Sequence, residues 1–164
     1  MIYGQIINSP IGFLTLKADD EALLSIDFGK SSEELTSNSI TELAAKELSE
    51  YFPGNRKEFT VPYKLCGTEF QKKVWQALTE IPYGKTASYE EIAVKIGNPK
   101  ACRAVGMANN KNKLPVIIPC HRVIGKSGSL TGYAGGIDIK EILLNIERKC
   151  QNEAEKSDDY SKGY

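Results

Sequence analysis

A cysteine followed directly by a histidine is the pair in this chain best suited to covalent chemistry. Cys120 carries the strongest nucleophile among the side chains, and His121 is the only histidine in the 164 residues. A thiol with an ordinary pKa of about 8.5 is mostly protonated at neutral pH, so it needs a base or a positive environment to react. The stretch Pro119-Cys120-His121-Arg122 is therefore the first candidate for a reactive site.

The adjacency of Cys120 and His121 affects how they can cooperate. Neighbouring side chains on an extended backbone point in different directions, so a bridging water is a natural link between thiol and imidazole. A carboxylate on the far side of the imidazole would fix its tautomer and favour its charged form. Glu147 is the candidate for this carboxylate, because it lies one position past Ile146 at the edge of an apolar helical stripe.

Each of these three residues also has a purely structural interpretation. Cys120 could be an inert core thiol, His121 a satisfied structural histidine and Glu147 a solvated helix charge. Taken singly, the structural interpretations are the better supported. Taken together with the basic helix pair described below, the functional interpretation is supported equally well.

Charge and cysteine usage narrow the class of protein. The net charge is zero, but residues 1–67 carry −4, residues 68–126 carry +6 and residues 127–164 carry −2. The basic middle contains the Cys-His pair, so an anionic partner competes with a merely solvated basic face. The four cysteines are widely spaced, which predicts neither a disulfide framework nor a zinc site. No signal-like segment opens the chain and no apolar run reaches the ~20 residues of a membrane span, so a cytoplasmic protein is expected.

Residues 1–67 are predicted to form a scaffold domain. Apolar alternation over the first 28 residues predicts an antiparallel meander of three strands. Residues 29–39 are predicted to be a loop, and a helix from about Ile40 to Phe52 is stopped by a Pro-Gly pair. We place a linker at 53–67 and expect nothing catalytic in this half.

Residues 68–150 are predicted to form a mainly helical domain. Thr68-Glu69-Phe70-Gln71 has the form of a capping box and opens an amphipathic helix. Ser88-Tyr89-Glu90-Glu91 is a second capping box, and the short helix behind it ends at Gly97. Two further segments matter here: Val116-Ile117-Ile118 is predicted to be a buried strand or extended rod, and a final helix is predicted over Asp138 to Lys149.

A third helix is expected directly after Gly97. Asn98 can cap it and Pro99 suits its first turn. Two short helices around a Gly-Asn turn are typical of a helix-turn-helix, and equally of a plain helical bundle. The outer face of the third helix is predicted to carry Lys100, Arg103 and Met107. The glycine-rich residues 125–136 are predicted to be a tight loop, and 151–164 a polar, disordered tail.

Three separated motifs resemble the O6-alkylguanine-DNA alkyltransferase family. The resemblance runs from about Phe70 to Glu147 and preserves the spacing of the motifs, whereas the N-terminal part fits the family's first domain more loosely. It implies an α+β fold with a ribonuclease-H-like N-terminal domain and a winged-helix-like C-terminal domain containing a helix-turn-helix. The motifs are Arg103-Ala104-Val105-Gly106, Pro119-Cys120-His121-Arg122-Val123-Ile124 and Gly132-Tyr133-Ala134-Gly135-Gly136.

The resemblance implies direct repair of alkylated guanine in duplex DNA. Cys120 would take the alkyl group from guanine O6 and keep it as a thioether, so each molecule would act once. Methylguanine is the expected substrate, and O4-alkylthymine is a second candidate. The family binds the minor groove and extrudes the damaged base. A monomer without cofactor or metal is expected.

The resemblance also implies roles for individual residues. His121 would deprotonate Cys120 through a water, Glu147 would orient His121, and Tyr89 would donate a proton to guanine N3. Asn112 would brace the segment before the cysteine, and Arg103 would occupy the place of the extruded base. The DNA-contacting helix would also use Lys100, Ala101, Cys102 and Ala104, and the substrate pocket Val123, Tyr133 and the backbone amide of Ala134.

The chain departs from the family pattern at two positions. Lys113 stands where proline is usual, and Ala134 stands where serine is common. Three other classes of protein are weaker candidates. Cys120 argues against the related lesion sensors that lack the acceptor cysteine, and no effector domain is visible for a cysteine-sensing transcription regulator. Adjacent Cys and His residues fit a Cys-His hydrolase poorly.

Overall fold

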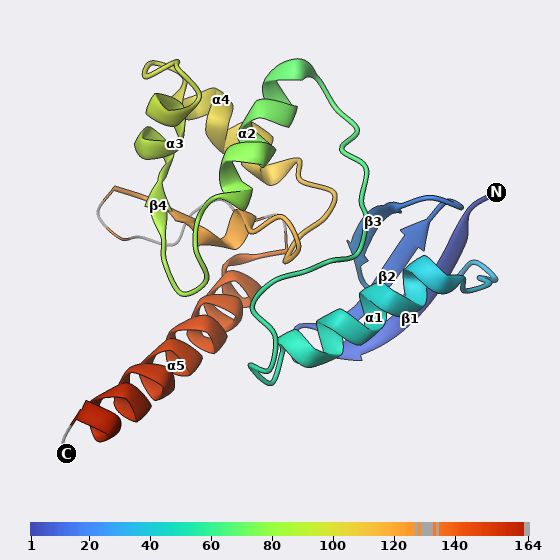
Figure 1. The fold of residues 1–164 in the computed structure, drawn as a ribbon. Helices are drawn as coiled ribbons and strands as arrows, with labels where there is room; N and C mark the ends of the chain where they lie inside the picture. Colours follow the sequence, from blue (N-terminus) through green and yellow to red (C-terminus); the bar gives the residue numbers. More distant parts are fainter. Residues whose placement is uncertain (127, 129–132, 134, 163–164) are drawn as a thin grey trace.

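Alternating apolar residues build the N-terminal sheet. Its strands are β1 (Tyr3–Ser9), β2 (Gly12–Ala18) and β3 (Leu23–Phe28), antiparallel in the order β1-β2-β3. Leu14 and Leu16 point to one face of β2 and are fully buried. Helix α1 (Ser39–Tyr51) lies along the sheet in Figure 1. The predicted meander and the following helix are confirmed.

The computed structural model describes residues 1–126, 128, 133 and 135–162, with the backbone alone for 151–162. Beyond the sheet, α2 (Glu69–Thr79), α3 (Tyr89–Lys95) and α4 (Cys102–Asn110) pack together. The predicted α+β class is therefore confirmed. Within the described part, no helix is long and apolar enough to cross a membrane.

Both predicted capping boxes are present. The Thr68 and Gln71 side chains each bond the other's backbone N–H at the start of α2, and Ser88 and Glu91 do the same for α3. Local signals of this kind depend on residues four apart or fewer. They are therefore readable from sequence before any tertiary contact is known.

The predicted start of α4 is wrong. Asn98 and Pro99 lie in a turn ahead of the helix, and the cap position belongs to Ala101, which makes no side-chain cap bond. Gly97, at φ +81°, ends α3, and the backbone N–H of Ala101 then bonds the carbonyl of Asn98. This turn uses the residues that would otherwise have capped the helix.

The segment before the cysteine is buried as predicted, but it is neither a strand nor an extended rod. Val116 adopts φ +74°, a left-handed conformation that β-branched residues rarely take. The backbone N–H of Ile118 bonds the Leu114 carbonyl at 2.9 Å, which closes a tight turn. Cys120–Arg122 then form a single 3₁₀ turn, followed by β5 (Val123–Ile124), which pairs in parallel with β4 (Ala87–Ser88).

Helix α5 (Ile137–Lys162) is longer than predicted. It continues past Lys149 through most of the residues expected to be a disordered tail, and it extends away from the other helices in Figure 1. Half of residues 151–162 are Glu, Lys, Gln or Ala, and the segment contains neither glycine nor proline. These residue types favour helix, and nothing in the segment stops one.

Candidate active site

Two asparagines hold the backbone around Cys120. The Asn112 amide donates to the Ile118 carbonyl at 2.8 Å, and its oxygen accepts the Leu114 N–H at 3.0 Å. Asn112 thus spans the strained turn, as expected of a brace. The amide of buried Asn109, which sequence reasoning missed, donates to the Cys120 carbonyl at 3.2 Å.

The thiol of Cys120 lies in a buried site. Only 3% of the residue is exposed, and burial raises the pKa of the thiol to about 11. The Asn112 amide, the Lys140 ammonium and the Tyr133 hydroxyl each favour the thiolate and limit this rise in pKa. The resting sulfur is therefore protonated at neutral pH and needs a base.

His121 contacts the carboxylate that the sequence predicted as its partner. Its Nε2 lies 2.6 Å from Oε2 of Glu147, and both side chains are buried. Burial lowers the pKa of His121 despite the pull of Glu147, so the imidazole is neutral at neutral pH. Because an ionised carboxylate can only accept, Nε2 carries the hydrogen and Nδ1 keeps its lone pair.

The Nδ1 atom of His121 is buried and has no hydrogen-bond partner among the described residues. A buried acceptor without a partner normally costs about 1–3 kcal/mol, so such an atom calls for an explanation. In a neutral imidazole on the residue that directly follows a protonated cysteine, a lone pair of this kind is suited to receive a proton. The arrangement can therefore perform base chemistry at Cys120.

Glu147 is the centre of a buried polar network. Arg122 donates from Nε to Oε1 at 2.8 Å and from Nη2 to Oε2 at 3.1 Å, and its Nη1 bonds the Ile81 carbonyl at 2.7 Å. The Gly84 N–H donates to Oε1 at 3.2 Å. Burial alone would raise the pKa of Glu147, but the bonds from His121 and Arg122 lower it to about 2. The carboxylate stays ionised at every physiological pH.

Tyr51, from α1, also belongs to this network. Its hydroxyl donates to Oε2 of Glu147 at 2.6 Å, across 96 residues of sequence. The N-terminal half, in which nothing catalytic is expected, thus supplies a hydrogen-bond donor to the carboxylate network. Tyr51 was one apolar position among several in a predicted helix, and no local pattern points to a partner so distant in sequence.

Lys140 is a second site residue that sequence reasoning missed. It is fully buried, and its ammonium donates to the carbonyl of Val123. Burial lowers the pKa of this lysine, while the nearby Cys120 sulfur raises it. A signal was present in the sequence, because Lys140 stands seven residues before Glu147 and so shares its helix face.

The predicted pocket residues are placed beside the thiol in part. Tyr133 is buried, and its ring meets that of Phe28 from β3 edge-on, with centroids 6.1 Å apart. Val123 is fully buried, and its backbone carbonyl accepts the hydrogen bond from Lys140. Ala134 lies outside the described residues. The Tyr89 ring, at the start of α3, lies against Gly106 of α4.

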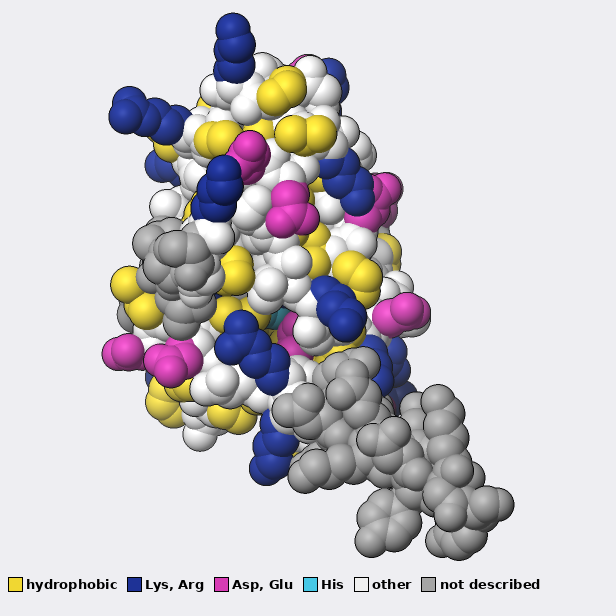
Figure 2. Space-filling model, turned by 90° about the vertical axis from the view of Figure 1, so that its left-hand side faces the viewer, with side chains coloured by type: hydrophobic (Ala, Val, Ile, Leu, Met, Phe, Trp, Pro, Cys, Tyr) yellow, Lys and Arg dark blue, Asp and Glu magenta, His cyan; other side chains and the backbone are white. Residues whose placement is uncertain are grey.

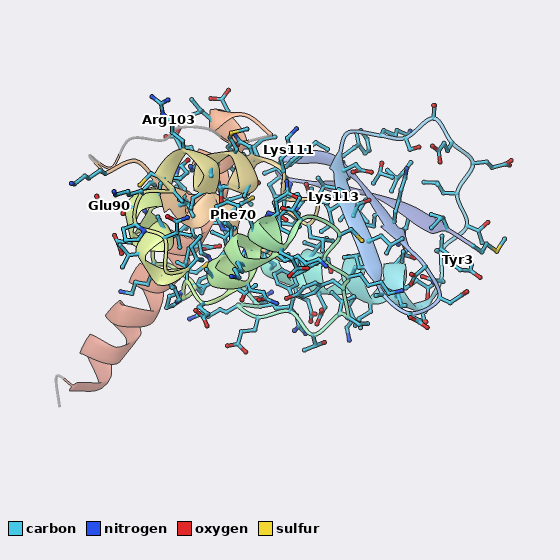
Figure 3. All side chains as sticks on the ribbon, turned by 90° about the horizontal axis from the view of Figure 1, so that it is seen from above. Tyr3, Phe70, Glu90, Arg103, Lys111 and Lys113 are labelled. Atoms are coloured by element: carbon cyan, nitrogen blue, oxygen red, sulfur yellow. The ribbon has the colours of Figure 1, made fainter. Side chains whose placement is uncertain are left out.

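The predicted DNA-contacting residues gather on α4 and just before it, away from the carboxylate network. Arg103 and Ala104 are exposed, and Arg103 points away from the body of the molecule in Figure 3. Figure 2 shows Lys and Arg side chains over the upper part of the molecule, where α3 and α4 lie, with apolar and some acidic side chains between them. Of the other predicted residues, Lys100 is exposed and Ala101 and Cys102 are half-buried.

A resident metal has no evident site in the described part of the chain, because no three His, Cys, Asp or Glu side chains there are placed to hold one. The chemistry available is that of a buried thiol, a neutral imidazole and an ionised carboxylate. Such a set can deprotonate a sulfur and let it attack an electrophilic carbon.

Comparisons with known proteins identify the family to which the chain belongs. Residues 69–149 match the family description "6-O-methylguanine DNA methyltransferase, DNA binding domain", and residues 2–65 match "6-O-methylguanine DNA methyltransferase, ribonuclease-like domain". A methylated-DNA–protein-cysteine methyltransferase from Methanosarcina acetivorans is 49% identical over 156 residues, covering 91% of this chain and 100% of the relative. A constitutive enzyme of the same name from Bacillus subtilis is 59% identical over 106 residues, 64% of each chain.

Solved structures give the same result. The O6-methylguanine methyltransferase of Mycobacterium tuberculosis superimposes with a TM-score of 0.83 at 46% identity, covering 91% of this chain and 94% of that one. A structure of the M. tuberculosis protein OGT in complex with DNA gives 0.82 at 45% identity, covering 90% and 94%. With family matches to both halves and relatives of this identity over nearly the whole chain, the protein belongs to the 6-O-methylguanine DNA methyltransferase family.

Proposed function

We propose that this protein repairs duplex DNA by transferring the methyl group of O6-methylguanine to Cys120. The observation that carries the proposal is the buried set formed by the Cys120 thiol, the adjacent residue His121 with an unpartnered Nδ1, and Glu147, whose ionised carboxylate lies 2.6 Å from Nε2 of His121. The names of the relatives, all methylated-DNA–protein-cysteine methyltransferases, support the same substrate class.

The proposed transfer is one displacement. The sulfur of Cys120 forms a bond to the methyl carbon while the bond from that carbon to guanine O6 breaks. The thiol proton passes through a water to Nδ1 of His121, and the departing guanine takes a proton at N3 from Tyr89. Glu147 stabilises the imidazolium that forms, because its charge lies 2.6 Å from Nε2.

The product is a thioether, which water does not cleave under mild conditions, so we propose that each molecule acts once. We also propose that the protein acts as a monomer. We place the protein in the cytoplasm, where free cysteines such as Cys120 and Cys66 stay reduced.

Because the thiol is buried, the damaged guanine has to leave the base stack and enter the site. Cys120 is 3% exposed, so a guanine stacked in a duplex cannot reach its sulfur. We propose that α4 enters the minor groove, that Arg103 fills the space of the extruded nucleotide, and that Tyr133 borders the pocket receiving it. The small side chain of Ala104 lets the helix approach the groove closely.

The proposal is tested by incubating the protein with a duplex containing one O6-methylguanine. We expect the peptide containing Cys120 to gain the mass of one methyl group, in proportion to the lesion lost, as measured by mass spectrometry. A duplex with unmodified guanine is the control. Unmodified Cys120 beside an intact lesion would refute the proposal.

The Tyr51 hydroxyl gives a prediction about pH. It withdraws charge from Oε2 of Glu147, so a Tyr51→Phe variant leaves that oxygen more negative towards His121. The imidazolium is then more stable and the pKa of His121 rises, which reduces the neutral base at mildly acid pH. We expect the acid limb of the pH–rate profile for methyl transfer to move to higher pH, with transfer on that limb slowed by roughly fivefold, as expected for one hydrogen bond.

Tyr83→Phe is the matched control for this variant. The Tyr83 hydroxyl is also buried in the same aromatic cluster, but it makes no hydrogen bond to Glu147. Its removal should leave the pH profile in place. An unshifted profile in Tyr51→Phe, or an equal shift in both variants, would contradict the role assigned to Tyr51.

A further inference from the structure

Met107 projects from the outer face of α4 without packing against the protein. It is 68% exposed, and among large apolar side chains in the described residues only that of the terminal Met1 is more exposed. The inner face of the helix is formed by Val105, Ala108 and Asn109, all buried. Folding therefore leaves this side chain in water, where a flexible apolar group contributes nothing to the core.

The neighbours of Met107 on the outer face of α4 are either basic or small. Arg103 lies four residues before it and Lys111 four residues after it, so the three side chains follow one line along the helix. The exposed side chain of Ala104 beside them is small and does not project. Residues 98–114 contain four basic side chains and no acidic one, so an acidic protein surface or a polyanion is the fitting partner and a neutral one is not.

The spacing along α4 favours DNA over other anionic partners. Four residues of helix span about 6 Å, close to two base-pair steps of about 3.4 Å each. An apolar side chain between cations suits a groove with phosphates on both sides and base edges at its floor. Methionine is one of the residues that proteins insert between base steps in the minor groove.

We propose that Met107 is an apolar wedge that enters the minor groove about two base-pair steps from the nucleotide replaced by Arg103, and partly unstacks the step it meets. This inference rests on the proposed binding of α4 in the minor groove. A wedge two steps away would loosen the stack flanking the damaged nucleotide and so make its extrusion easier. Met107 would contribute to extrusion without touching the reacting atoms.

The test uses 2-aminopurine, whose fluorescence rises when it leaves the base stack. It replaces a single adenine at each position within four steps on either side of the lesion, in separate duplexes. The protein carries Cys120→Ser, so that no transfer disturbs the measurement. We expect a rise at one position about two steps from the lesion, and its loss in Met107→Gln, which is similar in length but polar.

Affinity and its salt dependence provide a second measurement. Met107→Gln and Met107→Ala should weaken duplex binding by about tenfold, as expected for losing part of one buried apolar side chain. The slope of log affinity against log salt should not change, since no phosphate contact is lost. Lys111→Ala is the matched control, expected to reduce that slope by about 0.9 and to keep the fluorescence signal. Met107→Leu should keep both signal and affinity.

Fluorescence that is unchanged in Met107→Gln would overturn the wedge, and so would an affinity loss without any change in fluorescence. The proposed function fails separately. If unsubstituted protein transfers no methyl group while the signal on the duplex still depends on Met107, the wedge proposal is supported and the proposed repair function is refuted. If methyl transfer proceeds and the fluorescence signal does not change in Met107→Gln, the proposed repair function is supported and the wedge proposal is refuted.

Discussion

A Cys120→Ser variant is expected to bind methylated duplex and transfer nothing. A hydroxyl is far less acidic than a thiol, so neutral His121 cannot generate an oxygen nucleophile in this buried site. Removing the nucleophilic serine of a serine protease lowers its rate by on the order of 10⁶-fold. A loss of that size would place methyl transfer by Cys120→Ser below detection. The rate is measured as loss of O6-methylguanine with protein in excess.

Cys66→Ser is the control for this experiment. Cys66 is exposed, and among the described residues it is not one of the groups that act on the Cys120 thiol. Its substitution should leave methyl transfer unchanged. Transfer by Cys120→Ser, or a methyl group found on Cys66 in the native protein, would show that the acceptor has been assigned wrongly.

Replacing Glu147 should cost more stability than any other single substitution at the site. In Glu147→Gln the buried Arg122 loses its counter-charge, and breaking a buried pair in this way costs about 3–5 kcal/mol. The new amide also turns N–H groups towards donors from Tyr51 and His121. Urea denaturation at pH 7 should show this loss, and methyl transfer should fall with it.

The pH dependence of stability tests whether the loss in Glu147→Gln comes from the charge of the carboxylate. The pKa of Glu147 lies at about 2 in the folded protein against an ordinary 4.5, so its contribution is present above pH 4.5 and is lost as the pH falls towards 2. The stability difference between the native protein and Glu147→Gln should therefore shrink over that range. His121, whose pKa is lowered in the fold, adds a separate loss that begins below about pH 6.5 in both proteins.

Glu47 offers a matched control elsewhere in the fold. It is another fully buried glutamate, and it accepts the backbone N–H groups of Thr60 and Val61 and pairs with Arg56. Glu47→Gln should also destabilise the protein, but the protein that remains folded should keep its pH profile for methyl transfer. Equal effects of both variants on that profile would contradict the role of Glu147 beside His121.

The sequence was sufficient wherever structure depends on near neighbours. Capping boxes at Thr68 and Ser88 placed two helices, and strand alternation placed the sheet. The contact between Glu147 and His121 could be anticipated because a carboxylate at the edge of an apolar stripe is directed to the core margin. Motif resemblance added the roles proposed for the residues, which no periodicity could supply.

The sequence was insufficient where partners come from distant elements or where the backbone is strained. Tyr51 reaches Glu147 from another part of the fold, and its tyrosine identity alone gave no sign of this. Val116 reads as a strand residue because β-branched residues favour strands, yet the bonds made by Asn112 hold it at a positive φ. Tertiary contacts there override local preference.

The contacts between the two halves limit their modularity. Besides the Tyr51 bond, the backbone N–H of Ile26 bonds the carbonyl of Lys113 at 2.8 Å, and Phe28 packs on Tyr133. A chimera that joins the helical half to an N-terminal half from another protein would lose the hydrogen bond from Tyr51 to Glu147 and the packing of Phe28 on Tyr133. It would keep them only if the other protein supplied equivalent side chains. Phe28 and Tyr51 therefore have to be transferred together with Cys120, which lies 69 or more positions after them, although no direct contact with its thiol is involved.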